Sequence, residues 1–424
     1  MKHYLRLWLS FTAALILSVA IFNIIVDPYG MFRLVDRPGF NRVKPAAGPH
    51  GAMAKAYQVL RVQPRGLIFG NSRSEVGIDP ESPAWPESTR PVFNLALPGT
   101  GPQATLRYLQ HVLANSKERG VRKPEVVVWG IDFMDFLVDA SEQRPVEAAN
   151  KDVRLLANPD GSRNAYQSLQ KIRDYTEATL TLAAFLDSVG TITNRENPFS
   201  EDLTPLGFNP MRDYLKIEAD EGYHAVFRQK DIENTRANLR RPKDLFDADG
   251  RSSSAFDALR QVMALCRQNH IALYLIIFPY HAHLQEIIRI TGHWPAFESW
   301  KREIVHIAET ADTSHGKAVQ VWDFSAINEL TSEAVPPVND RSTVMRWYWE
   351  AGHFKRELGD MILNRIFARA GGNDHFGVRL TSDNVDSQIA AMRAQETSYR
   401  QSHPQDMEEL EAIATDIESR QRKR

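Results

Sequence analysis

Short apolar runs recur along the chain after residue 60. They are mostly continuous rather than alternating, and they lie at residues 66–69, 92–97, 126–129, 271–278 and 318–324. Continuous apolar runs are typical of β-strands that are buried on both faces, as in a parallel sheet. The pattern therefore predicts five buried strands.

Helical periodicity appears between or after these runs. Apolar residues recur at helical spacing in 103–116, 255–268, 297–308 and 354–367. Alternating strands and helices favour right-handed crossover connections, which place successive strands side by side and parallel. We therefore predict an α/β domain with a doubly wound, parallel, five-stranded sheet.

The N-terminus has a different pattern. Residues 7–26 carry no charge, and about 20 such residues in a helix span a hydrocarbon core of about 30 Å. Lys2 and Arg6 precede this segment, so the positive-inside rule predicts a cytoplasmic N-terminus and an exported remainder. We predict an uncleaved signal anchor in a bacterial inner membrane, with most of the chain periplasmic. A small-residue motif ending at Ala20 leaves cleavage open as the alternative.

The other segments differ in composition. A stretch rich in Pro and Gly follows the anchor, and this composition indicates a linker. A long insertion leaves the end of the third strand, where open α/β folds bind ligands, and we expect it to cap the cleft. The predicted segments are a cytoplasmic 1–6, an anchor 7–26, a linker 27–60, an α/β domain 61–139 and 253–370, a cap 140–252 with a long helix around 165–186, and a charged helical tail 371–424, solvated or partly disordered.

Charge and cysteine content exclude several classes of protein. The chain has 51 Lys and Arg against 53 Asp and Glu, a net charge of −2, so no bulk positive field favours nucleic-acid binding. Its single cysteine, Cys266, excludes an intramolecular disulfide and a zinc site built on several thiolates.

A serine follows the first predicted strand directly. Gly70, Asn71 and Ser72 form a Gly-x-Ser turn between that strand and a helix. Such a turn places the hydroxyl at the carboxyl edge of the sheet, where the backbone N–H groups of a helix N-terminus can stabilise an oxyanion. Ser72 is a candidate nucleophile. The alternative is an ordinary helix N-cap.

The next two strands end at the same edge. Asn94 and Gly99 close the second strand, and a glycine there can turn its N–H toward the cleft without a side chain in the way. Asp132 closes the third strand in Gly-Ile-Asp. An ionised aspartate cannot donate a hydrogen bond, so Asp132 either orients the serine loop or caps a turn.

A carboxylate and an imidazole lie close together before the last predicted helix. Glu350 and His353 are spaced as Glu-x-x-His, which allows the carboxylate to reach one ring nitrogen while the other faces a serine. The alternative is a helix start with a histidine cap. We expect the Ser72 hydroxyl within hydrogen-bond distance of the His353 ring, with Glu350 behind that ring.

A second histidine pair follows the fourth strand. His281 and His283 could ligate a metal, but no third ligand stands at a familiar spacing, so we assign no metal. His281 is instead a candidate substrate-facing residue. A soluble metal hydrolase built on this pair would require that residues 7–26 are not an anchor.

The chain resembles the SGNH (GDSL) hydrolase superfamily in four motifs and their order. These are the Gly-x-Ser, the Asn-x-x-x-x-Gly, the Gly-x-Asp and the acid-x-x-His. The anchor and layout are similar to its membrane-anchored bacterial branch, which includes alginate O-acetyltransferases and proteins of teichoic-acid D-alanylation. The resemblance implies a flavodoxin-like sheet, Ser72 as nucleophile, and His353 as general base. It also implies that the N–H groups of Ser72 and Gly99 form the oxyanion hole. No cofactor is implied.

Two positions depart from the family pattern. Asp132 stands where the family has an asparagine that donates to the oxyanion, and Glu350 stands where it has an aspartate. Two functions follow as hypotheses. One is an exported serine esterase or O-acyltransferase that acts on acyl groups of a cell-surface polysaccharide or envelope polymer, with a membrane acyl-donor protein as partner if it transfers. The other is a catalytically silent protein that binds glycan or acts as a scaffold in polysaccharide export.

Overall fold

The computed structural model describes residues 1–140, 153–310, 319–367 and 376–422. Contacts divide the chain into two compact units. The first comprises Met1–Gln63, Gln110–Val121 and Lys151–Lys216, and the second comprises Pro64–Leu109, Arg122–Asn150 and Ile217–Arg424. The stretch expected to form a cap is therefore shared, because Lys151–Lys216 belong to the first unit and the rest of that stretch belongs to the second.

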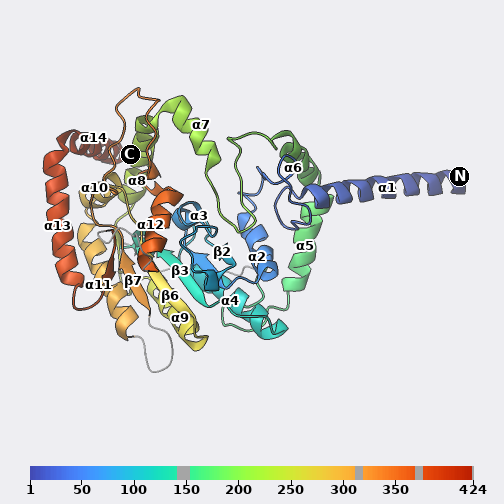
Figure 1. Cartoon of the computed structure of the whole chain (residues 1–424), viewed down its shortest axis with the longest axis horizontal. Coiled ribbons are helices and arrows are strands. Elements are labelled where there is room, and N and C mark those ends of the chain that lie inside the picture. Colours follow the sequence, from blue (N-terminus) through green and yellow to red (C-terminus); the bar gives the residue numbers. More distant parts are fainter. Residues whose placement is uncertain (141–152, 311–318, 368–375, 423–424) are drawn as a thin grey trace. The chain divides into compact units, whose positions relative to one another are not determined.

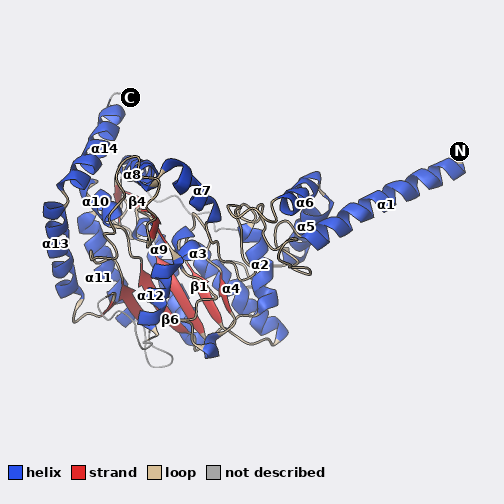
Figure 2. Cartoon of the chain, turned by 45° about the horizontal axis from the view of Figure 1, so that its top comes forward, coloured by secondary structure: helices blue, strands red, loops and turns tan. Residues whose placement is uncertain are grey.

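The second unit is built on one mixed six-stranded sheet, drawn in red in Figure 2. Its strand order is β10-β7-β6-β3-β1-β2, and all neighbours pair in parallel except β10, which runs antiparallel to β7. The strands are β1 (Gly66–Phe69), β2 (Val92–Asn94), β3 (Val126–Ile131), β6 (Ala272–Ile277), β7 (Gln320–Asp323) and β10 (Val378–Leu380).

The prediction of an all-parallel, five-stranded sheet is therefore corrected. The five predicted strands are present and parallel, but β10 adds a sixth from the segment predicted to be a helical tail. This edge strand covers only three residues, with Arg379 exposed at its centre. Such a short strand with one buried position leaves almost no periodic signal in the sequence.

Helices surround this sheet (Figure 1). Four of them begin within three residues of the predicted starts, because each buries one apolar face against the sheet or its neighbours. They are α4 (Pro102–Arg119), α9 (Ser254–Gln268), α11 (Trp294–Thr310) and α12 (Arg356–Ile366). Two more helices, α3 (Ser72–Gly77) and α10 (Ala282–Ile290), had no predicted bounds. Two short hairpins, β4 (Val138–Asp139) with β5 (Lys243–Asp244) and β8 (Tyr348–Glu350) with β9 (His353–Phe354), lie outside the main sheet.

The C-terminal segment is helical but not fully solvated. It forms α13 (Val385–Ser402) and α14 (Pro404–Arg422), and α14 packs on α10 and on α8 (Tyr223–Leu239). Tyr399, Met407 and Leu410 bury their side chains against Ala282 and Ile287 of α10. The many charged residues conceal this narrow apolar stripe in the sequence.

The first unit contains α1 (Lys2–Val26), α2 (Gly51–Val62), α5 (Gln167–Leu180) and α6 (Leu182–Thr193), together with the end of α4. α1 is long and apolar enough to cross a membrane. The stretch predicted to be a linker instead holds α2 and contributes buried Tyr29, Met31 and Tyr57 to a small core.

The single helix expected around residues 165–186 is interrupted at Thr181. Thr181 has an extended backbone and its side chain accepts a hydrogen bond from the N–H of Ala184, so it ends α5 and caps α6. Threonine is a favoured N-cap residue for this reason. The result is a helical hairpin rather than one long helix.

Candidate active site

Ser72 is the first residue of α3, immediately beyond the end of β1. Asn71 caps this helix, because its side-chain oxygen accepts from the N–H of Arg73 at 3.1 Å. Gly70 has φ +137°, and a Cβ there would lie 2.8 Å from the carbonyl oxygen of Gly130 and would overlap Ser74. The tight turn that presents Ser72 at the strand end therefore requires glycine.

The β8–β9 hairpin brings an imidazole to this serine. His353 Nε2 lies 2.8 Å from Ser72 Oγ, although the two residues are 281 positions apart in the sequence. On the other side of the ring, His353 Nδ1 is hydrogen-bonded to Glu350 Oε1. Ser72, His353 and Glu350 thus form a hydroxyl–imidazole–carboxylate chain, the arrangement in which an imidazole can remove a proton from a serine.

Glu350 is almost fully buried, at 1% exposure, and its second oxygen accepts from the N–H of Gly352 at 2.7 Å. Burial by itself raises the pKa of this carboxyl group. The hydrogen bonds from His353 and Gly352, together with the positive charge of Arg73, outweigh burial and lower the pKa to about 2. Glu350 is therefore ionised at neutral pH and holds the His353 proton on Nδ1.

Asp132 and Arg73 form an ion pair beside the serine. Asp132 is buried, and its oxygens also accept from Asn71 Nδ2 at 2.8 Å, from the Tyr280 hydroxyl at 2.9 Å and from the N–H of Met134 at 3.2 Å. The Asp132 carboxylate therefore ties together the turn before α3, the end of β3 and the segment after β6. Asp132 therefore organises the site but provides no hydrogen-bond donor for an oxyanion.

Sequence reasoning missed Arg73. Its guanidinium group lies 5.5 Å from the centre of the Tyr280 ring, and a Cβ on Gly352 would come within 3.2 Å of Arg73 Nη2. Arg73 thus stands between Asp132 and the hairpin turn that carries Glu350. Its position directly after the candidate nucleophile was the available signal, but an arginine in the first turn of a helix is usually solvated.

Asp135 is a second acid in the same cluster. Asn71 Nδ2 lies 3.3 Å from Asp135 Oδ2 and is shared with Asp132. Burial, and then the nearby charge of Asp132, raise the pKa of Asp135 to about 8. Asp135 is therefore largely protonated at neutral pH, which limits the negative charge next to Ser72.

Two residues predicted at the oxyanion edge have different surroundings. Asn94 is fully buried, and its side-chain N–H₂ donates to the carbonyls of Ser74 and Ile78, at 2.9 Å each. It secures the C-terminal half of α3, so its amide is directed away from the serine hydroxyl. Gly99 is exposed in a turn with φ +68°, two residues after Leu97, whose N–H donates to the Gly70 carbonyl at 3.0 Å.

His281 is buried and does not line an open cleft. Its Nε2 is hydrogen-bonded to the carbonyl of Glu333 at 2.9 Å, and its Nδ1 accepts from the N–H of His283 at 3.2 Å. Burial lowers the pKa of His281 to about 3, so the ring is neutral. Its backbone N–H donates to the Ala351 carbonyl at 3.3 Å, so His281 supports the hairpin that carries Glu350 and His353.

His283 forms a separate charged cluster. Its Nδ1 is 2.9 Å from Asp231 Oδ2 on α8, and its Nε2 is 3.7 Å from Asp406 Oδ2 on α14. Burial lowers the pKa of His283, but the two carboxylates outweigh it and raise the pKa to about 10. A cavity of about 350 Å³ adjoins this cluster and is lined by Phe227 among others.

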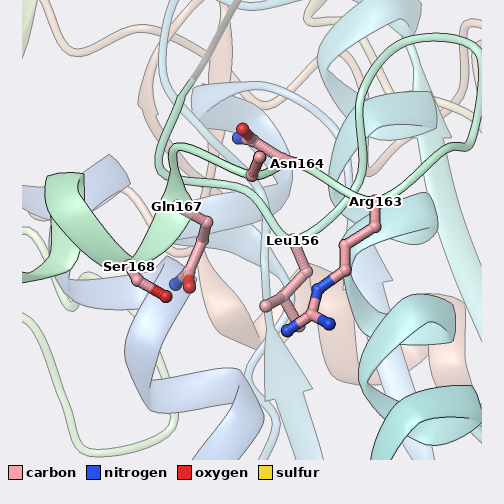
Figure 3. Close-up of a pocket in the computed structure, with 6 residues that line it drawn as sticks. Leu156, Arg163, Asn164, Gln167 and Ser168 are labelled. Atoms are coloured by element: carbon pink, nitrogen blue, oxygen red, sulfur yellow. The ribbon is translucent and has the colours of Figure 1, made fainter.

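A small cavity of about 240 Å³ lies in the first unit (Figure 3). Leu156, Arg163, Asn164, Gln167 and Ser168 line it, and none of them was predicted to act in a site. The Asn164 amide donates to the carbonyls of Val153 and Leu155, both at 2.9 Å. This cavity brings no nucleophile and base together.

Within the described residues, no three His, Cys, Asp or Glu side chains are grouped so that they could hold a metal ion. Comparison of the chain with protein-family models and with curated protein sequences found no match. The geometry around Ser72 is therefore the feature from which a function can be inferred.

Proposed function

We propose that the protein is a membrane-anchored serine esterase or O-acyltransferase of the SGNH type. The observation that carries this proposal is the 2.8 Å contact between Ser72 Oγ and His353 Nε2, with the buried Glu350 carboxylate on the other ring nitrogen. A serine that only caps a helix does not require a histidine oriented in this way. The five parallel strands that deliver Ser72 to the sheet edge are also compatible with this family.

In the proposed reaction, His353 Nε2 takes the Ser72 proton while Ser72 Oγ attacks an acyl carbonyl carbon. The N–H groups of Ser72 and Gly99 hold the resulting oxyanion, and ionised Glu350 stabilises the imidazolium. His353 then gives its proton to the departing alkoxide, which leaves an acyl ester on Ser72. A sugar hydroxyl or water, deprotonated by His353, attacks that ester and regenerates the serine.

In this proposal, Arg73 neutralises the charge of Asp132 next to the oxyanion. The family's asparagine donor is replaced by a carboxylate whose charge would oppose an oxyanion, so an unpaired Asp132 would slow the reaction. The ion pair with Arg73 neutralises that charge, and the proton on Asp135 removes a second negative charge. The site is left with two backbone donors and no net repulsion of an oxyanion.

We place the substrate and partners outside the cytoplasm. With α1 as a single-pass anchor in a bacterial inner membrane, the catalytic unit faces the periplasm, where polysaccharides and other acylated envelope polymers are modified. Transfer would require a membrane protein that supplies the acyl group, whereas hydrolysis would not. The near-zero net charge gives no support for a nucleic-acid partner.

Active-site labelling tests the proposal directly. A fluorophosphonate probe should label the purified full-length protein in detergent and should not label Ser72→Ala. Ser74→Ala is the matched control, because Ser74 lies on the same short helix and its buried hydroxyl has no hydrogen-bond partner among the described residues. Equal labelling of Ser72→Ala and the native protein would exclude Ser72 as the nucleophile.

The silent alternative has one observation in its favour. The Asp132 carboxylate accepts hydrogen bonds and donates none, so the site has one oxyanion donor fewer than the family pattern. A glycan-binding or scaffold protein should bind polysaccharide equally well as the native chain, as Ser72→Ala and as His353→Ala. Loss of function in cells with either variant would instead support the enzyme.

A further inference from the structure

Helix α6 presents two opposite faces of different character. Ala184 and Ser188 are buried within the first unit. On the other side, Leu182, Leu186 and Val189 are 72%, 58% and 40% exposed. We call these three side chains the α6 apolar face. One exposed leucine is ordinary on a protein surface, but three at helical spacing on one face form a patch that suits an apolar partner.

The buried side of the α5–α6 hairpin packs against the last turns of α1. The rings of Phe22 and Phe185 lie 5.7 Å apart. Asn23 Nδ2 donates to the carbonyl of Thr179 at 3.0 Å, and Asn23 Oδ1 accepts from the Ser188 hydroxyl at 2.9 Å. Figure 2 shows α5 and α6 beside the C-terminal end of α1, with the rest of that helix extending away.

The length of α1 fixes the depth of this contact. From Leu7 to Val26, a rise of about 1.5 Å per residue gives about 30 Å, the thickness of a hydrocarbon core. The mostly exposed part of α1, from Leu7 to Ser18, gives only about 18 Å and cannot span it. The turns around Phe22 must therefore also lie in the bilayer, about 22 Å from its inner boundary.

Phe22 then lies roughly 8 Å below the outer boundary, and Phe185 of α6 is in contact with it. An amphipathic helix lying in the membrane interface buries its apolar face by about 5–10 Å. α6 also lacks Lys and Arg, and the carboxylate of Asp187 is occupied by the Tyr29 hydroxyl at 2.7 Å. Asp187 is therefore the one ionisable side chain of this helix, and a protein hydroxyl replaces part of its hydration.

We infer that the α6 apolar face is a membrane-docking surface whose partner is the lipid of the outer leaflet. The inference rests on the proposed role of α1 as a membrane anchor. Leu182, Leu186 and Val189 contact acyl chains just below the headgroups, so the first unit is held at the bilayer by a second apolar element. Because α6 has no basic residue, zwitterionic lipid is sufficient for this contact.

Fluorescence in lipid vesicles tests this inference on the full chain. Leu186→Cys, Leu15→Cys and Val344→Cys are each labelled with an environment-sensitive dye and reconstituted into phosphatidylcholine vesicles with or without a doxyl-labelled lipid. The native Cys266 is fully buried and does not compete for the label. Val344 is the matched control, since it is an apolar residue that is 70% exposed in the other unit.

We expect the probe at residue 186 to be quenched by doxyl lipid as the Leu15 probe is, and to be several-fold less accessible to iodide than the Val344 probe. Iodide accessibility without lipid quenching at residue 186, with lipid quenching at residue 15, would overturn the inference and leave the anchor in place. Shielding from iodide without lipid quenching would also overturn it, because a protein would then cover this face. Absence of lipid quenching at residue 15 would remove the anchor itself.

Discussion

Two of the carboxylate–imidazole pairs in the second unit differ in the group that the far ring nitrogen faces. In the first, Glu350 holds His353 Nδ1, and Nε2 lies 2.8 Å from the Ser72 hydroxyl. In the second, Asp231 holds His283 Nδ1, and Nε2 lies 3.7 Å from another carboxylate, that of Asp406. The hydroxyl can give up a proton to the ring, whereas the carboxylate stabilises a proton already on it.

The same pair of residue types therefore supports two different roles. Two carboxylates keep His283 charged, so it links α8, α10 and α14 as an ion pair and is unavailable as a base. His353 faces a single carboxylate and is partly exposed, at 24% of its side chain, so substrate can reach it. Exposure and the partner of Nε2, rather than the pair itself, distinguish an imidazole that can act as a base from a structural one.

The largest effect should come from exchanging the histidines for alanine. His353→Ala removes the base, and we expect the rate of fluorophosphonate labelling to fall by about 10⁵–10⁶, as for catalytic histidines in other serine hydrolases. His283→Ala, the matched variant, should change that rate by less than about tenfold because it does not touch Ser72. Similar losses in labelling for both variants would show that the comparison between the two pairs is wrong.

Glu350→Gln should have the next largest effect. The amide keeps the shape of the side chain but cannot hold the His353 proton on Nδ1, so the ring adopts the wrong tautomer. We expect a loss of about 10⁴ in labelling or esterase rate, the size found for the equivalent change in a serine protease. Glu350→Asp should recover part of it. A Gln variant with the native rate would mean that the carboxylate has no role in orienting the base.

Much of this site is predictable from the sequence, for a physical reason. Ser72 follows a parallel strand, and such strands end at the edge where open α/β folds bind ligands. Glu350 and His353 are recognisable by their Glu-x-x-His spacing, although the β8–β9 hairpin that carries them lies outside the main sheet. Arg73 could not be found in this way, because its role depends on an ion pair with a residue 59 positions away. Asn94 and His281 were expected to face substrate, but local spacing does not reveal that Asn94 secures α3 and that His281 supports the β8–β9 hairpin.

The fold likewise divides into elements that the sequence pattern predicts and elements that it does not. Continuous apolar runs predict the five parallel strands, because both faces of each are buried. Short elements that bury only one or two side chains, such as β10, leave no comparable pattern. Helices α13 and α14 expose most of their surface, so their buried residues are outnumbered by charges.

A smaller effect, on stability, should separate the two acids beside Ser72. Asp132→Asn leaves the guanidinium of Arg73 buried without its counterion, and breaking such a pair costs about 3–5 kcal/mol. Asp135→Asn is the matched change, and we expect a shift below about 1 kcal/mol because Asp135 is largely protonated at neutral pH. Denaturant unfolding of the full chain in detergent measures both. Equal losses would contradict the different charge states inferred for these two acids.

The smallest effect concerns pH and tests the second pair. The pKa of His283 is raised from its ordinary value of 6.5 to about 10, so the folded state holds a proton that the unfolded state releases between these values. The stability from this proton is fully present below pH 6.5 and is lost as pH rises through 10, with a slope of at most about 1.4 kcal/mol per pH unit. Asp406→Asn removes one of the two carboxylates that hold the proton and so lowers the pKa of His283 in the folded state. The decrease should still begin near pH 6.5, but it should end at lower pH and be smaller in total. His283→Gln should lose this part of the pH dependence altogether, because no group remains there to titrate. An unchanged slope in the Gln variant would show that His283 is neutral, and the contrast with His353 would then rest on geometry alone.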